Sequence, residues 1–133
     1  MKPKVLLRIA AVLMLLHAVG HTMGALSWSQ APNARLAAVV TAMQTEHFVF
    51  MGRNASLALF YNGYGIIMIF ALLFISVQLW LLSMVFNRLM VLAMGLFLLA
   101  MCICEYLYFF PFAAAFTGIA AVLTFIAYAR QRV

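Results

Sequence analysis

Three histidines and two carboxylates are the residues of this chain best suited to chemistry. His17 and His21 are four positions apart, so a helix presents both on one face. Glu46 and His47 follow as neighbours in a more polar stretch. Imidazole and carboxylate ligands suit zinc or non-haem iron, so we predict a metal site of His17, His21, Glu46 and His47, with haem as another possible cofactor. Two alternatives stay open: a hydrogen-bonded network inside a helical bundle, and a proton-handling site.

Glu105 is the other carboxylate, and it lies within a strongly apolar run. A carboxylate at membrane depth is energetically expensive and usually faces protein or water. We therefore take Glu105 and His47 as the candidate catalytic residues, acting as general acid or base. The alternative is that Glu105 pairs with Arg53 or a histidine and only locks the helices together. The sequence leaves open whether the chain is an enzyme.

Six further side chains are candidates for binding a ligand, because they bring hydrogen-bonding groups and aromatic rings to one level of the predicted helices. They are Arg53, Asn54, Tyr61, Asn62, Tyr64 and Tyr106. Arg53 and Asn54 could hold an anionic head group or a substrate carboxylate. Alternatively, Arg53 is an interfacial anchor whose charged end reaches water. On a helix that continued from residue 47, His47, Asn54 and Tyr61 would share a face at spacings of seven.

The elements that must position these residues are transmembrane helices. Hydrophobic residues make up 69% of the 133 positions and charged residues only 8%, whereas a soluble protein is roughly half apolar and a quarter charged. A span takes about 20 residues, so the sequence predicts one domain over 1–133, an all-α integral membrane four-helix bundle. The expected spans are residues 5–26, 56–82, 89–110 and 112–129. A short amphipathic helix over 33–44, on the outer side, connects the first two spans.

The basic residues set the expected orientation. The net charge of +6 comes from lysines and arginines that are scattered singly, which indicates membrane topology and not a nucleic-acid partner. The side of the termini carries Lys2, Lys4, Arg8, Arg88, Arg130 and Arg132. The opposite side carries Arg35 and Arg53. Because basic residues favour the cytoplasmic side, we expect both termini in the cytoplasm and residues 27–55 outside. All the histidines and carboxylates then lie toward the outer side.

The helix face that carries His17 and His21 is expected to pack against protein. Gly20 and Gly24 lie beside it, and two small residues at this spacing let helices approach closely. Ionisable groups inside a membrane protein usually face the bundle interior or a water-filled space. We therefore predict that the polar faces of the helices converge on one pocket that opens outward.

Two classes of function fit this pattern. The first is a binding or accessory membrane protein whose pocket holds a small molecule, a lipid or a partner helix. The second is a small membrane enzyme, metal-assisted or redox, that uses His17, His21, His47 and Glu105. The expected partners are the lipid bilayer, a hydrophobic small molecule and further copies of this chain. No reaction motif separates the two classes, and we favour the first.

Two resemblances add to this interpretation. The stretch His17–Leu26, which reads His-x3-His-Thr-x-Gly-Ala-Leu, and the stretch Phe48–Gly65 together resemble a group of small, uncharacterised four-helix membrane proteins of bacteria. That resemblance implies a bacterial inner-membrane location and names no activity. In size and helix number the chain is also similar to DoxX-type membrane proteins. This second resemblance implies respiratory or quinone-linked redox work, and no functional residue is carried over from it.

Overall fold

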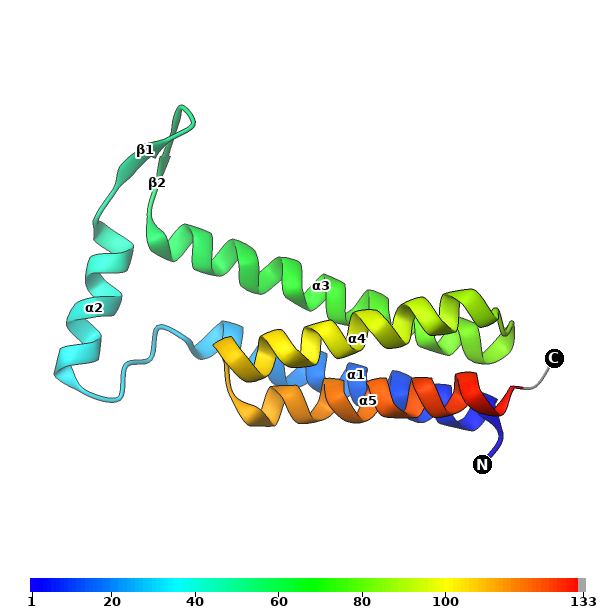
Figure 1. Cartoon of the computed structure of the whole chain (residues 1–133). Coiled ribbons are helices and arrows are strands. Elements are labelled where there is room, and N and C mark those ends of the chain that lie inside the picture. The colour runs from blue at the N-terminus through cyan, green and yellow to red at the C-terminus, as the bar shows by residue number, and fades with distance from the viewer. Residues whose placement is uncertain (132–133) are drawn as a thin grey trace. The chain divides into compact units, whose positions relative to one another are not determined.

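The computed structural model describes residues 1–131 and is almost entirely helical (Figure 1). Five helices and one short hairpin follow one another along the chain. Their bounds are α1 Pro3–Ser27, α2 Ala34–Thr45, β1 Phe48–Phe50, β2 Arg53–Ala55, α3 Leu57–Met84, α4 Arg88–Tyr108 and α5 Pro111–Arg130. The predicted all-α class is confirmed, and the short helix between the first two long helices is present.

Four of these helices, α1, α3, α4 and α5, are long and apolar enough to cross a membrane. Each of their ends lies no more than two residues from the predicted one. Local chemistry explains the breaks between them. The side chain of Asn87 accepts a hydrogen bond from the Met90 amide and so caps α4. Pro111 occupies the first turn of α5, where its missing amide hydrogen is tolerated, and the chain reverses there between two predicted spans.

The chain divides into two compact units. The first unit comprises residues 1–18 and the part of the chain from residue 71 onward, and the second comprises residues 19–70. The first unit therefore holds the beginning of α1, the end of α3, and all of α4 and α5. The second holds the end of α1, α2, the hairpin and the beginning of α3.

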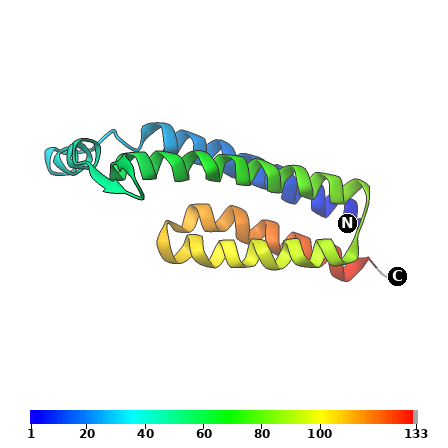
Figure 2. The same ribbon diagram turned by 90° about the horizontal axis from the view of Figure 1, so that it is seen from above.

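In the first unit, α4 and α5 form a closely packed antiparallel pair (Figures 1 and 2). The buried side of α5 consists of small residues that recur every three or four positions. They are Ala113, Ala114, Thr117, Ala120, Ala121, Thr124 and Ala127. Two glycines make the approach close. A Cβ atom added to Gly118 would lie 2.9 Å from the Cys102 sulfur, and one added to Gly95 would lie 2.9 Å from the Phe125 ring. Small residues at a helix interface let backbones approach in this way.

The beginning of α1 packs against the end of α3 through polar contacts as well as apolar ones. Ser76 donates a hydrogen bond to the main-chain oxygen of Ala11, at 2.8 Å. The Arg8 guanidinium lies 4.8 Å from the centre of the Trp80 ring. At the same end of the unit, Arg130 donates a hydrogen bond to the main-chain oxygen of Met1 at 3.0 Å, which joins the end of α5 to the start of α1.

In the second unit, α2 runs crosswise to the beginning of α3 (Figures 1 and 2). Asn33 caps α2 by accepting a hydrogen bond from the Leu36 amide. None of the side chains of α2 is buried. An exposed helix of this kind suits the surface of a membrane better than the interior of a helical bundle.

The hairpin β1–β2 was not predicted, and it corrects one expectation. Phe50 pairs with Arg53, and Met51 and Gly52 form the two-residue turn between them, both with positive φ. This is the backbone that a tight hairpin turn requires. Residues 48–55 are therefore extended, so the prediction that His47, Asn54 and Tyr61 share a face of one helix is wrong.

The glycine pair at the end of α1 also differs from expectation. Within the described part of the chain, nothing lies within 4 Å of a Cβ atom built on Gly20 or Gly24. The close approach in this unit occurs at Gly65 instead, where an added Cβ would lie 3.4 Å from that of Ala25. Gly20 and Gly24 thus face open space among the described residues, whereas the neighbouring histidines contact protein, His17 through Thr117 and His21 through the main-chain oxygen of Gly65.

Candidate functional site

A polar cluster in the first unit unites three helices. His17 of α1 and Thr117 of α5 share a hydrogen bond of 3.1 Å between the imidazole Nδ1 and the threonine Oγ1. The other ring nitrogen of His17, Nε2, lies 3.9 Å from Oε1 of Glu105 on α4. The separation is within ion-pair range but too long for a direct hydrogen bond. One imidazole therefore joins α5 to α4 through its two nitrogens.

This cluster is almost completely withdrawn from the surface. Thr117 is 0% exposed, His17 8% and Glu105 9%. The Phe116 ring lies beside the imidazole, with 6.0 Å between the ring centres. Among the described residues, the second carboxyl oxygen of Glu105, Oε2, has no hydrogen-bond partner. A buried polar atom without a partner is uncommon and calls for an explanation, such as local strain or a chemical role.

The sequence predicted two of the three members. His17 and Glu105 were both candidates, and the structure brings them together. Thr117 was missed, although a signal was present: Thr117 and Thr124 are the polar positions in the otherwise alanine-rich buried side of α5. The predicted pairing of Glu105 with a histidine is therefore seen.

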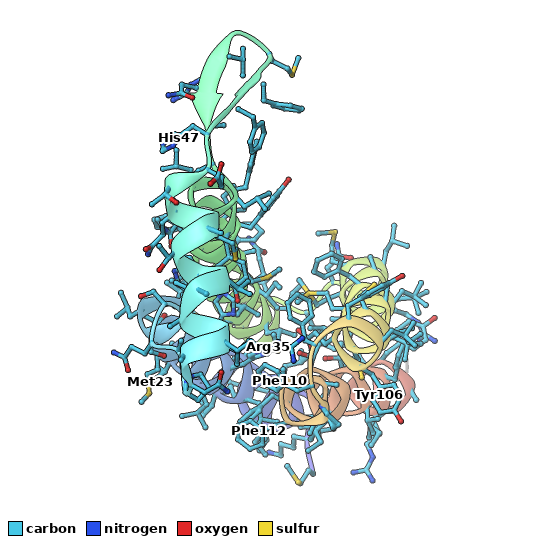
Figure 3. The ribbon with its side chains drawn as sticks, turned by 90° about the vertical axis from the view of Figure 1, so that its left-hand side faces the viewer. Met23, Arg35, His47, Tyr106, Phe110 and Phe112 are labelled. Carbon is cyan, nitrogen blue, oxygen red and sulfur yellow. The ribbon has the colours of Figure 1, made fainter. Side chains whose placement is uncertain are left out.

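The other histidines have different surroundings, in the second unit. His21 Nε2 lies 3.1 Å from the main-chain oxygen of Gly65, a contact that fastens the end of α1 to the beginning of α3. His47 lies where α2 passes into the hairpin, at the opposite end of α2 from Arg35 (Figure 3). Its Nδ1 is 2.8 Å from the main-chain oxygen of Thr45, and the ring is exposed, as is Glu46.

The predicted metal site does not assemble in the described residues. Over residues 1–131, no three or more histidine, cysteine, aspartate or glutamate side chains lie together in a way that could hold a metal ion. The hydrogen bonds of the histidines explain the difference. His17 is engaged by Thr117, while His21 and His47 each contact a main-chain oxygen.

The six ligand-binding candidates are spread over several elements. In the second unit, Trp28 donates a short hydrogen bond of 2.6 Å to the Asn62 side chain, and its ring lies 4.8 Å from that of Tyr61. Trp28 is thus a partner that the sequence did not suggest. Arg53 and Asn54 are exposed on β2, and Tyr64 and Tyr106 are exposed on α3 and α4. Neither of the two cavities in the first unit is lined by any of the six.

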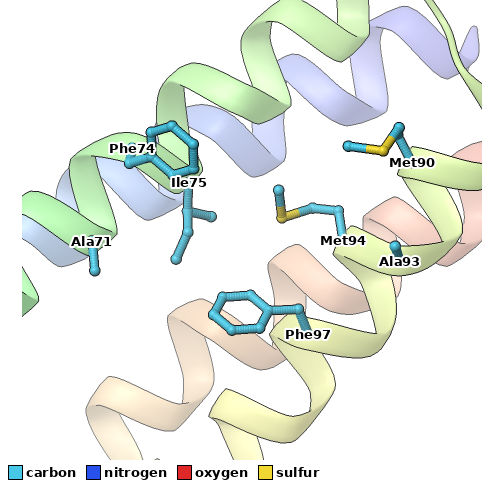
Figure 4. Close-up of a pocket in the computed structure, with 7 residues that line it drawn as sticks. All are labelled: Ala71, Phe74, Ile75, Met90, Ala93, Met94 and Phe97. Carbon is cyan, nitrogen blue, oxygen red and sulfur yellow. The ribbon is translucent and has the colours of Figure 1, made fainter.

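The larger of those cavities lies between α3 and α4 and is apolar (Figure 4). Its volume is about 300 Å³. The seven lining side chains are Ala71, Phe74, Ile75, Met90, Ala93, Met94 and Phe97. The two helices are joined by only a few residues, so close packing between them would be expected. The structure instead leaves a hollow that no polar side chain lines.

Comparison with known proteins finds no matching family model, no similar curated protein and no similar solved structure. The fold and the site therefore define the chain only as a helical protein with four helices that fit a membrane. The resemblances to small bacterial four-helix proteins and to DoxX-type proteins stay predictions.

Proposed function

We propose that this chain is an integral membrane protein that binds a hydrophobic small molecule in the cavity between α3 and α4. The observation that carries the proposal is the wholly apolar lining of a cavity of about 300 Å³. This volume is at the lower end of the range of ligand pockets, which is roughly 300–1,000 Å³. The proposal retains the predicted binding role but replaces the predicted polar pocket with an apolar one.

The residues around the cavity suit an elongated, flexible ligand. Met90 and Met94 are unbranched and polarisable, and such side chains adapt to apolar surfaces of irregular shape. Phe74 and Phe97 are more than half exposed although they line the hollow, so their rings are available to a ligand. A hydrocarbon or isoprenoid tail fits these features, because it needs no hydrogen-bond partner.

A quinone with an apolar tail is a direct probe of the proposal. The full chain, purified in mild detergent, is expected to bind decylubiquinone saturably and at one molecule per chain. Ala93→Phe places a ring in the cavity and is expected to weaken binding about tenfold, equivalent to about 1.4 kcal/mol. Affinity is measured by native mass spectrometry over a concentration series.

Ala100→Phe is the matched control for this substitution. Ala100 is exposed on α4 two turns beyond Ala93, and it does not line the cavity. Its replacement is expected to leave the affinity for decylubiquinone within about twofold of that of the original chain, well under the roughly tenfold loss expected for Ala93→Phe. Equal losses in the two variants, or no saturable binding by the original chain, would sink the proposal.

We also propose a bacterial inner-membrane location with both termini in the cytoplasm. Support comes from the basic residues of the first unit. Lys2 and Lys4 lie at the start of α1 and Arg8 in its second turn, and Arg88 and Arg130 occupy the helix ends on the same side. Fluorescent protein fused after Val133 is expected to be bright, and alkaline phosphatase fused there inactive. The opposite pattern would reverse the orientation.

A small membrane enzyme is the second candidate function, and one observation favours it. The buried pair His17–Glu105 leaves one carboxyl oxygen without a hydrogen-bond partner among the described residues. A positioned imidazole and carboxyl group can transfer a proton to or from a bound substrate. This function would be redox or metal-assisted. It requires that the purified protein contain bound zinc, iron or haem, or that it turn over a quinone.

A further inference from the structure

Arg8 is an arginine inside a predicted span, and neutral groups hold it in place. Its Nε donates a long hydrogen bond of 3.4 Å to the Ser83 hydroxyl, which itself donates to the main-chain oxygen of Trp80 at 2.6 Å. The guanidinium lies over the Trp80 ring, 4.8 Å from its centre. Stacking on an aromatic face orients a guanidinium while its edge can still donate to an anion.

A shallow apolar hollow runs along α1 beside this guanidinium. Its volume is about 250 Å³, and Arg8 lines it together with Val5, Ile9, Val12 and Leu13. These positions recur at helical spacing on one face, so the hollow follows the helix axis. Val5, Ile9 and Val12 are each more than a third exposed. Arg8 lies near the N-terminal end of this strip, and Ile9, Val12 and Leu13 follow it along the helix. This order matches an anionic head group with a hydrocarbon tail.

The charges around Arg8 are all of one sign. Lys4 lies one helical turn before Arg8, and Lys2, Arg88 and Arg130 occupy the same end of the first unit. Arg88 and Arg130 are hydrogen-bonded to main-chain oxygens, of Gln131 and Met1. The chain has only two side-chain carboxylates: Glu105 is near the far end of α4, and Glu46 belongs to the second unit. Among the described residues of the first unit, no side-chain carboxylate therefore neutralises this end.

We propose that Arg8 and Lys4 bind the phosphate of an anionic phospholipid whose acyl chain lies along Val5, Ile9, Val12 and Leu13. The phosphate supplies a negative charge that the described side chains at this end of the first unit do not. The Trp80 ring holds the guanidinium so that it meets the phosphate with paired N–H donors, the geometry in which arginine binds phosphate most strongly. Basic pockets between membrane helices on the cytoplasmic side bind anionic head groups by the same chemistry. This site is separate from the cavity between α3 and α4.

The experiment compares two lipids with identical acyl chains, phosphatidylglycerol and phosphatidylcholine, on the full chain in mild detergent. Native mass spectrometry is expected to show phosphatidylglycerol bound at least about tenfold more tightly. Arg8→Gln is expected to abolish most of this preference. Arg35→Gln removes the same charge in the second unit, so it serves as the matched control and should change binding less than about twofold.

Two further measurements keep the proposal falsifiable. Val12→Trp fills the strip without touching the charge, and it should weaken both lipids even if Arg8→Gln fails to fold. Inorganic phosphate, which has no tail, should not compete with phosphatidylglycerol at equal concentration. The proposal is overturned if inorganic phosphate competes equally, if Val12→Trp has no effect, or if Arg8→Gln and Arg35→Gln lower the binding equally.

Discussion

The variant His17→Leu is expected to lose about 3–5 kcal/mol of unfolding free energy, the largest effect of any single substitution proposed for this chain. Leucine is close to histidine in size, so the loss is not one of packing. It arises because Thr117 and Glu105 would each lose a partner within the buried cluster. A buried polar group left unpaired is destabilising by its full desolvation penalty. Unfolding by sodium dodecyl sulfate in mixed micelles measures the change.

The double variant His17→Leu/Glu105→Leu is expected to recover most of that loss. Replacing both members of a buried polar pair by apolar side chains is often neutral or even stabilising. His47→Leu is the matched control, because His47 is exposed and contacts only a nearby main-chain oxygen. Its effect should stay within about 0.5 kcal/mol. Recovery in the double variant identifies the cluster as a helix lock.

The opposite outcome would favour the enzyme. If His17→Leu leaves the stability unchanged, the cluster does not hold the helices together, and its burial needs another reason. Zinc, iron and haem are measured on the same purified samples. Stoichiometric cofactor in the original protein that disappears in both His17→Leu and Glu105→Gln would assign the pair to binding that cofactor, as the enzyme hypothesis requires.

The sequence predicted the long helices well because their signal is strong and local. Each span is a run of about 20 apolar residues, and asparagine or proline stands where the chain turns. Asn87 caps the start of α4, and Pro111 occupies the first turn of α5. The helical face shared by His17 and His21 followed from spacing alone. Composition and spacing fix such features, because they depend only on residues near in the chain.

The hairpin could not be predicted because its signal in the local sequence is weak. Each of its strands has only three residues, too few for an alternating pattern to show. Its turn is Met51–Gly52, whereas asparagine-glycine is the usual signal for such a turn. The stretch was therefore placed in the outer segment before the second span, and a helix continuing from residue 47 was considered for it, but no strand was predicted. Phe48 and Phe50 pack against Phe60 of α3. Phenylalanine suits a membrane span as well as it suits a strand, so these residues do not distinguish the two.

The side-chain contacts between different helices also could not be predicted from the sequence. Thr117 contacts His17 from a position 100 residues away, and no spacing rule connects the two. The apolar cavity between α3 and α4 depends on how far two helices separate, and a run of apolar residues gives no information on that distance. Contacts of this kind are decided by packing of the whole first unit, which only the structure supplies.

The effect of Gly118→Ala on stability is expected to change sign when the neighbouring Cys102 is replaced. In the original chain, the new methyl group would lie 2.9 Å from the Cys102 sulfur, so the cysteine side chain, which is hydrogen-bonded to the Ala114 oxygen, or one of the two helices must shift. Overpacking of this kind destabilises by about 1–3 kcal/mol. In a Cys102→Ala background the sulfur is gone. The same Gly118→Ala substitution should then be neutral or stabilising by up to about 1 kcal/mol, because alanine favours the helix over glycine.

The coupling between the two sites, rather than either single effect, is the quantity of interest. Stabilities of the four proteins in this cycle are measured by thermal unfolding in mild detergent, and a coupling of about 2 kcal/mol is expected, within the range for residues in contact. Gly63→Ala is the control, since nothing in the described chain lies within 4 Å of an added Cβ there. Additive effects would show that α4 and α5 are not held at the separation that the structure gives them. Coupling of the expected size would instead establish the close pairing of α4 and α5, the scaffold that places Glu105 beside His17 and Thr117.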